Sequence, residues 1–126
     1  MKFSEHIDPT INRIRNYGSG SVQVNQTPYT RSCVISQTQL ITDWPVHDID
    51  QLDTDQLQTL LDLKPEVLLL GSGEQQRFPH PKLFQYAAQR GISLEVMDNA
   101  AACRTYNVLT TENRQVIVAL ILPASD

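Results

Sequence analysis

The chain has 126 residues, of which 40% are apolar and 19% charged, proportions that suit a single globular domain over residues 1–126. The formal net charge is −4 and the basic residues are scattered from Lys2 to Arg114, so we expect no nucleic-acid partner. No apolar run approaches the roughly 18 to 20 residues of a membrane helix, and the first residues carry no apolar signal region. We therefore expect no membrane span and a cytoplasmic location.

The cysteines and histidines show no spacing that is typical of a metal or redox site. Cys33 and Cys103 lie far apart in sequence, and no histidine is placed near either one as a zinc ligand would be. In a cytoplasmic protein a disulfide between two such distant cysteines is unusual. The sequence thus predicts no disulfide, no metal and no cofactor.

The first forty residues predict antiparallel β-structure. Residues 11–17 and 21–25 form two segments joined by a glycine-containing turn, which is typical of a β-hairpin. Pro28 is expected to interrupt the chain before two further short strands, at residues 32–36 and 39–42.

From residue 53 onward the apolar pattern becomes helical. Asp53 and Gln56 have the spacing of a capping box, which predicts a helix that Lys64-Pro65 brings to an end. Residues 67–70 then form a continuous apolar run, bounded by a proline and a glycine and too short for a helix. Such a run predicts a strand that is buried on both faces.

Two more helices alternate with strands in the rest of the chain. A helix from Pro81 to Gly91 and a strand at residues 92–97 complete a strand–helix–strand unit with parallel strands. A third helix, residues 99–112, and a last strand, residues 115–122, extend it to βαβαβ. The predicted fold is a three-layer α/β domain with a central mixed, mostly parallel sheet and an N-terminal antiparallel hairpin region, all in one sheet system. The second helix is expected to face inward with Leu83, Phe84, Ala87 and Ala88.

Residues 71–73 directly follow the first buried strand, where open α/β sheets place their ligands. A dinucleotide loop would need a third glycine where Gln76 stands, and no phosphate-loop lysine is present. Two readings stay open. These glycines either line a ligand crevice or only allow the chain to turn sharply away from the strand.

The third helix supplies the other candidate residues. Its apolar stripe excludes Arg104 and Asn107 and leaves Cys103 at the margin. Its N-terminus is expected near residues 71–73, where an anion could bind with the help of Arg104. Cys103 is either a reactive thiol or an inert packing residue. No catalytic residues are predicted, and the candidate ligand-binding residues are Gly71, Ser72, Gly73, Asn99 and Arg104. The stripe expected to face inward is Ala101, Ala102, Thr105, Tyr106, Val108 and Leu109.

Five short motifs follow one another along the chain, at residues 68–73, 91–92, 95–98, 101–109 and 112–114. Together they resemble a small domain family of unknown biochemical function that includes a mitochondrial complex I assembly factor and an adipogenesis-associated relative. The resemblance implies a three-layer α/β fold and no established enzyme activity.

Two functional hypotheses follow. The first is a non-enzymatic binding or assembly-accessory protein that docks a partner protein. The alternative is a small anionic-ligand-binding protein or enzyme that uses the crevice at residues 71–73 and the start of the helix at Asn99. The sequence does not indicate an oligomeric state.

Overall fold

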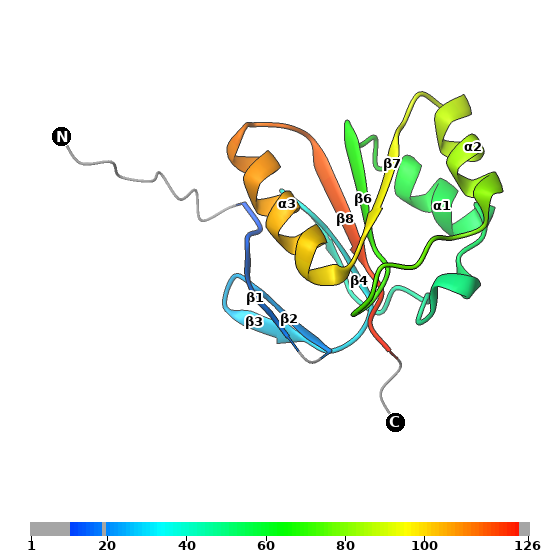
Figure 1. The fold of residues 1–126 in the computed structure, drawn as a ribbon. Helices are drawn as coiled ribbons and strands as arrows, with labels where there is room; N and C mark the ends of the chain where they lie inside the picture. Colours follow the sequence, from blue (N-terminus) through cyan, green and yellow to red (C-terminus); the bar gives the residue numbers. More distant parts are fainter. Residues whose placement is uncertain (1–10, 19, 124–126) are drawn as a thin grey trace.

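The computed structural model describes residues 11–18 and 20–123, which form three layers around a central sheet (Figure 1). This sheet has the strand order β5-β4-β8-β6-β7. β6 pairs in parallel with β7 and β8, whereas β4 pairs antiparallel with β5 and β8. The predicted mixed α/β architecture with its βαβαβ half is confirmed. The strands are β4 (Cys33–Ser36), β5 (Leu40–Ile41), β6 (Val67–Gly71), β7 (Leu94–Met97) and β8 (Val116–Leu120).

Helices cover both faces of this sheet. α1 (Thr54–Leu61) and α2 (Pro81–Gln89) lie on one face, and α3 (Asn99–Thr111) lies on the other (Figure 1). Successive strand residues point to opposite faces, so Leu68 of β6 joins the core beneath α1 and α2 while Leu69 joins the core beneath α3. β6 is therefore buried on both sides, as predicted. None of the helices in the described ranges has the length and apolar character needed to cross a bilayer.

A second, smaller sheet lies against α3 (Figure 1). It contains β1 (Ile14–Gly18), β2 (Ser21–Val24) and β3 (Thr27–Tyr29) in the antiparallel order β1-β2-β3. The predicted hairpin is β1 and β2, but the expectation of one sheet system was wrong. The expected interruption at Pro28 was also wrong, because Pro28 pairs with Gln23 inside β3. A proline is tolerated there since β3 is an edge strand.

The helix starts follow the capping rules. Asp53 and Gln56 form the predicted capping box at the start of α1. Asp48 and Gln51 form a second one at a short 3₁₀-helix, η1 (Ile49–Gln51), which the sequence did not reveal. Asp98 caps α3 by accepting a hydrogen bond from a backbone N–H of its first turn. These caps fix where the loops at the carboxyl ends of the strands give way to helices.

The buried face of α3 is wider than predicted. Cys103 is buried and Asn107 is half-buried against β1, whereas Val108, which was expected to face inward, is 57% exposed. The reason is that α3 packs against both the central sheet and β1, so its covered arc extends past the apolar stripe. Ala88 of α2 was likewise expected to face inward, but it is exposed.

Candidate functional site

Residues 71–73 and Asn99 meet where β6 ends and α3 begins, in an arrangement that we call the Gly71–Asn99 junction. The Asn99 backbone N–H donates to the Gly73 carbonyl (2.8 Å), and the Gly73 N–H donates to Asn99 Oδ1 (3.2 Å). Asn99 Nδ2 donates to the carbonyl of Ile121 (2.9 Å) and to the hydroxyl of Tyr17 (3.2 Å). Asn99 is only 1% exposed, so this amide ties β6, β8, α3 and the small sheet together.

Gly71 is required by a close approach of the chain to this amide. A Cβ atom at this position would collide with Asn99 Oδ1 and lie 2.7 Å from Leu120 Cδ2. Real side chains do not tolerate such contacts without movement of their neighbours. The absence of a side chain at Gly71 is thus explained by packing alone.

Ser72 shapes the loop that follows β6. Its Oγ donates to the Gln75 carbonyl (2.9 Å) and accepts from the Arg77 N–H (2.9 Å). Its backbone N–H donates to the carbonyl of Met97 at the end of β7 (2.9 Å). The polar groups of Ser72, like those of Asn99, are therefore already hydrogen-bonded to other residues of the same chain.

The N-terminus of α3 is already engaged as well. Asp98 Oδ1 accepts from the Ala101 N–H (2.8 Å), and the Asn99 N–H bonds to the chain at Gly73. A carboxylate thus stands where an anion would have to bind. Arg104 does not join the junction, since its exposed side chain lines a different hollow.

One hollow, of about 220 Å³, lies between the loop after β6 and η1, and we call it the loop hollow. Ser72 and Gly73 line it together with His47, whose buried Nδ1 has no hydrogen-bond partner among the described residues. Arg77 closes one side through contacts with Asp48 (3.4 Å) and Asp50.

The charged side chains beside the loop hollow, Asp48, Asp50 and Arg77, interact only weakly with one another. The backbone N–H of Asp50 lowers the pKa of the Asp48 carboxyl, and Arg77 lowers it further. The ion pairs of Arg77 are half-exposed, and exposed pairs of this kind hold little energy. Sequence reasoning left His47 and Arg77 out of the candidate site, because no motif spacing relates a residue before η1 to the loop after β6.

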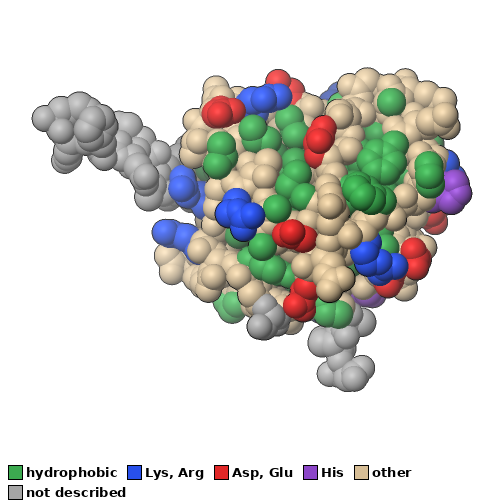
Figure 2. Space-filling model, in the orientation of Figure 1, with side chains coloured by type: hydrophobic (Ala, Val, Ile, Leu, Met, Phe, Trp, Pro, Cys, Tyr) green, Lys and Arg blue, Asp and Glu red, His purple; other side chains and the backbone are tan. Residues whose placement is uncertain are grey.

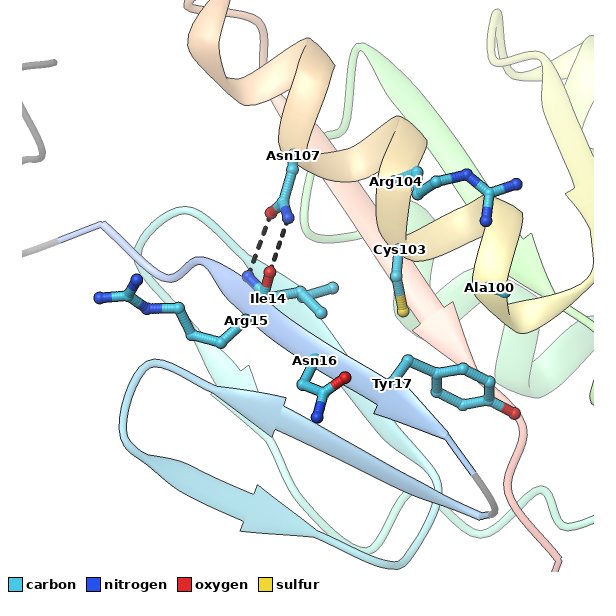
Figure 3. A pocket seen from close by; sticks show the side chains of 8 residues that line it. All are labelled: Ile14, Arg15, Asn16, Tyr17, Ala100, Cys103, Arg104 and Asn107. Atoms are coloured by element: carbon cyan, nitrogen blue, oxygen red, sulfur yellow. Dashed lines mark hydrogen bonds between the residues drawn. The ribbon is translucent and has the colours of Figure 1, made fainter.

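The second hollow, of about 230 Å³, lies between β1 and α3 (Figure 3). We call it the β1–α3 groove. The amide of Asn107 crosses one end of it: its Nδ2 donates to the Ile14 carbonyl (2.6 Å) and its Oδ1 accepts from the Ile14 N–H (3.0 Å). This pair of bonds is what a neighbouring β-strand would make. The lining residues are Ile14, Arg15, Asn16, Tyr17, Ala100, Cys103, Arg104 and Asn107.

Cys103 lies at the bottom of the β1–α3 groove and is 5% exposed. The pKa of its thiol is raised to about 12, mainly by burial and to a smaller extent by Cys33, against an opposing effect of Arg104. Cys33 is also a free, buried thiol whose pKa burial raises to about 12. At neutral pH both groups are protonated thiols, the form that is a poor nucleophile.

Comparisons with known proteins find relatives in bacteria and animals. A "13 kDa major membrane protein" of Francisella tularensis subsp. holarctica (strain LVS) is 32% identical over 108 residues, which cover 85% of this chain and 88% of that protein. The "NADH dehydrogenase (ubiquinone) 1 alpha subcomplex assembly factor 3" of Xenopus tropicalis is 30% identical over 112 residues. That match covers 87% of this chain but only 61% of the assembly factor.

Solved structures share the same fold. The solution structure of a Bordetella pertussis protein, described as a Mth938-like domain, matches with a TM-score of 0.82 and 29% identity. The match covers 100% of this chain and 94% of that one. The family model described as "Protein of unknown function (DUF498/DUF598)" matches residues 14–121, which include both sheets and all three α-helices. The chain therefore belongs to the DUF498/DUF598 family.

Proposed function

We propose that this chain is a non-enzymatic accessory protein that docks a partner protein during the assembly of a larger complex. The observation that carries the proposal is the internal use of the junction's polar groups. Ser72, Gly73 and Asn99 bond to other parts of the chain, so the predicted crevice offers a substrate few free donors or acceptors. Relatives named as complex I assembly factors support the same role.

Exposed apolar side chains give a partner something to bury. Phe78 is 63% exposed beside Phe84, with the two ring centroids 6.4 Å apart, and Val108 is 57% exposed on α3. Aromatic side chains are enriched at protein interfaces. Their exposure supports the docking of a partner protein.

The test is recovery of a defined partner. Tagged full-length chain is used as bait in extract of its native cell, and each protein recovered is then purified and mixed with the bait at several salt concentrations. We expect one partner to elute with the chain as a stable complex in size-exclusion chromatography. Failure of every recovered protein to form such a complex would contradict the proposal.

A second candidate function, binding of a small anionic ligand or its conversion in the crevice, is favoured by one observation. His47 lines the loop hollow with Ser72 and Gly73, and its buried Nδ1 has no hydrogen-bond partner in the part of the chain that the structure describes. A buried polar atom of this kind is usually satisfied by a ligand or water. A ligand at about 100 times its Kd would stabilise the fold by about 2.7 kcal/mol. A panel of anionic metabolites should then raise the Tm of the wild type more than that of His47→Ala. A flat response to the whole panel would eliminate this candidate.

The proposal includes the expected cytoplasmic location. The Francisella relative carries a name that places it in a membrane, so location is worth measuring directly. Fractionation of native cells should leave the chain in the supernatant after membranes are sedimented at moderate salt. Recovery in the membrane pellet after a salt wash would contradict this part of the proposal.

A further inference from the structure

The outer edge of β1 faces α3. In an antiparallel ladder, alternate residues turn their backbone N–H and C=O groups away from the paired strand. Ile14 does so, and Asn107 binds both of its groups. The register shifts by one residue between Ile14 and Asn16, after which the same alternation turns the backbone of Tyr17 away from β2. No bond outside the ladder satisfies these groups of Tyr17 among the described residues. An open piece of strand edge therefore lines the β1–α3 groove.

The charged side chains that line the groove are both basic. Arg15 and Arg104 are exposed, and neither makes an ion pair with a carboxylate in the described ranges. Figure 3 shows Arg104 extended above Ala100 and Arg15 at the other end of the groove. Figure 2 shows basic side chains on the left of the view, over β1 and α3, with acidic side chains nearby. In a chain of net charge −4 this local positive charge favours an acidic partner.

Two acidic side chains, Glu74 and Asp98, stand near the Tyr17 hydroxyl but do not line the groove. Asp98 and Glu74 lie close enough to the Tyr17 hydroxyl to raise its pKa, in addition to the larger effect of burial. A carboxylate of a ligand is repelled there and attracted toward the arginines. The less polar part of the lining is Ile14, Tyr17, Ala100 and Cys103, which suits a peptide backbone with small or apolar side chains.

We propose that the β1–α3 groove binds an extended acidic segment of a partner protein, which pairs its backbone with Tyr17 and its carboxylates with Arg15 and Arg104. The inference rests on the proposed partner-docking function and names the surface and chemistry that it uses. Addition of a peptide to a strand edge supplies backbone hydrogen bonds, while side-chain contacts supply specificity. The complex should weaken as salt screens the two exposed arginines.

Nuclear magnetic resonance on the ¹⁵N-labelled full chain tests the proposal with a defined probe, a short peptide that alternates glutamate and valine. We expect saturable shifts confined to residues 14–17 and 100–107, with the Tyr17 amide among the largest. Reversal of both charges, Arg15→Glu with Arg104→Glu, should weaken binding at least about tenfold. Lys82→Glu on α2 is the matched control and should bind like the wild type. The neutral pair Arg15→Gln with Arg104→Gln should give an intermediate affinity, and spectra of all variants must match the wild type outside the groove.

Several results would overturn the inference. Equal binding of a lysine–valine peptide, or of the glutamate–valine peptide to the double charge reversal, would remove the electrostatic basis. The same shifts with free glutarate would indicate a site for small anions, and concentration-dependent shifts without peptide would indicate a second copy of the chain. Failure here is distinct from failure of the proposed function. A recovered partner that binds the double variant as tightly as the wild type disproves the groove alone, whereas the absence of any partner disproves the docking role.

Discussion

The Gly71–Asn99 junction and the β1–α3 groove are both built on α3, yet they use their polar groups in opposite ways. At the junction, the Asn99 amide bonds to the neighbouring backbone and is almost fully buried. In the groove, Asn107 satisfies one residue of the β1 edge and leaves two arginines and the next edge position open. Changes at the junction should therefore alter stability, and changes in the groove should alter binding.

The largest expected effect concerns Cys103, which lies beneath the groove. A pKa raised from 9.0 to about 12 lowers the thiolate fraction at a given pH about a thousandfold relative to the unfolded chain. Alkylation of the native protein at pH 8 should be slower by at least that factor than alkylation in urea, as followed by mass spectrometry. Rapid native labelling would instead restore the reactive-thiol hypothesis.

The raised pKa of Cys103 also makes the stability of the fold depend on pH in the alkaline range. The thiol ionises near pH 9 when the chain is unfolded but near pH 12 in the folded protein. Rising pH across this interval therefore favours the unfolded chain, and the free energy of unfolding should fall. Cys103→Ala should make this alkaline loss of stability shallower.

At the junction, we expect Asn99→Ala to cost about 3 kcal/mol of unfolding free energy, because it leaves the buried Ile121 carbonyl and the partly buried Gly73 N–H without partners. Urea denaturation monitored by circular dichroism measures the change. Gln89→Ala, on the exposed side of α2, is the control and should change stability by less than about 0.5 kcal/mol. Equal effects of the two substitutions would show that the junction is not a structural hub.

Gly71→Ala should cost about 2 kcal/mol, because the new Cβ must displace Asn99 or Leu120. The same denaturation experiment applies. Gly18→Ala is a matched control, since no heavy atom lies within 4 Å of a Cβ placed there. If Gly71→Ala were as stable as the wild type, the close approach to Asn99 could not explain the glycine.

In the groove, Asn107→Ala should cost only about 1 to 2 kcal/mol, because Ile14 lies at a half-open edge where water can replace the lost amide. Val108→Ala, one residue along α3 and exposed, should be nearly neutral. A larger loss of unfolding free energy for Val108→Ala than for Asn107→Ala would indicate instead that α3 is oriented as the apolar stripe predicted.

The smallest expected change in stability is that of Arg15→Glu with Arg104→Glu. Both side chains are exposed and without an ion pair in the described part of the chain, so the free energy of unfolding should stay within about 0.5 kcal/mol of the wild type. Thermal unfolding and the peptide titration, carried out on the same sample, measure the stability of the variant and its affinity for the peptide. A large loss of stability would show that the groove arginines, like the junction residues, stabilise the fold.

Local patterns predicted much of the fold. The apolar run at residues 67–70, the Asp53 capping box and the alternation of helices with strands each depend on neighbours in sequence, and each is present in the structure. The covered face of α3 was not predictable in this way. Asn107 bonds to Ile14 across 93 residues, and only this long-range contact turns a polar helix position inward.

The candidate site shows the same limit. The meeting of residues 71–73 with Asn99 follows from parallel strands and was expected, whereas the separation of Arg104 from them follows from its angular position on α3. His47 comes from a loop whose position is set by the packing of η1, and no pattern relates it to Ser72.

The amide of Asn107 has a consequence for the colloidal behaviour of the protein. Free strand edges can pair with other chains and start aggregation. In the small sheet one edge is covered at Ile14 by this amide, and the other contains Pro28, which has no N–H to offer a new strand. The edge left open at Tyr17 offers the backbone groups of one residue, which limits pairing there to a short segment. We therefore expect this single helical asparagine to reduce edge-to-edge association of the small sheet in concentrated solution.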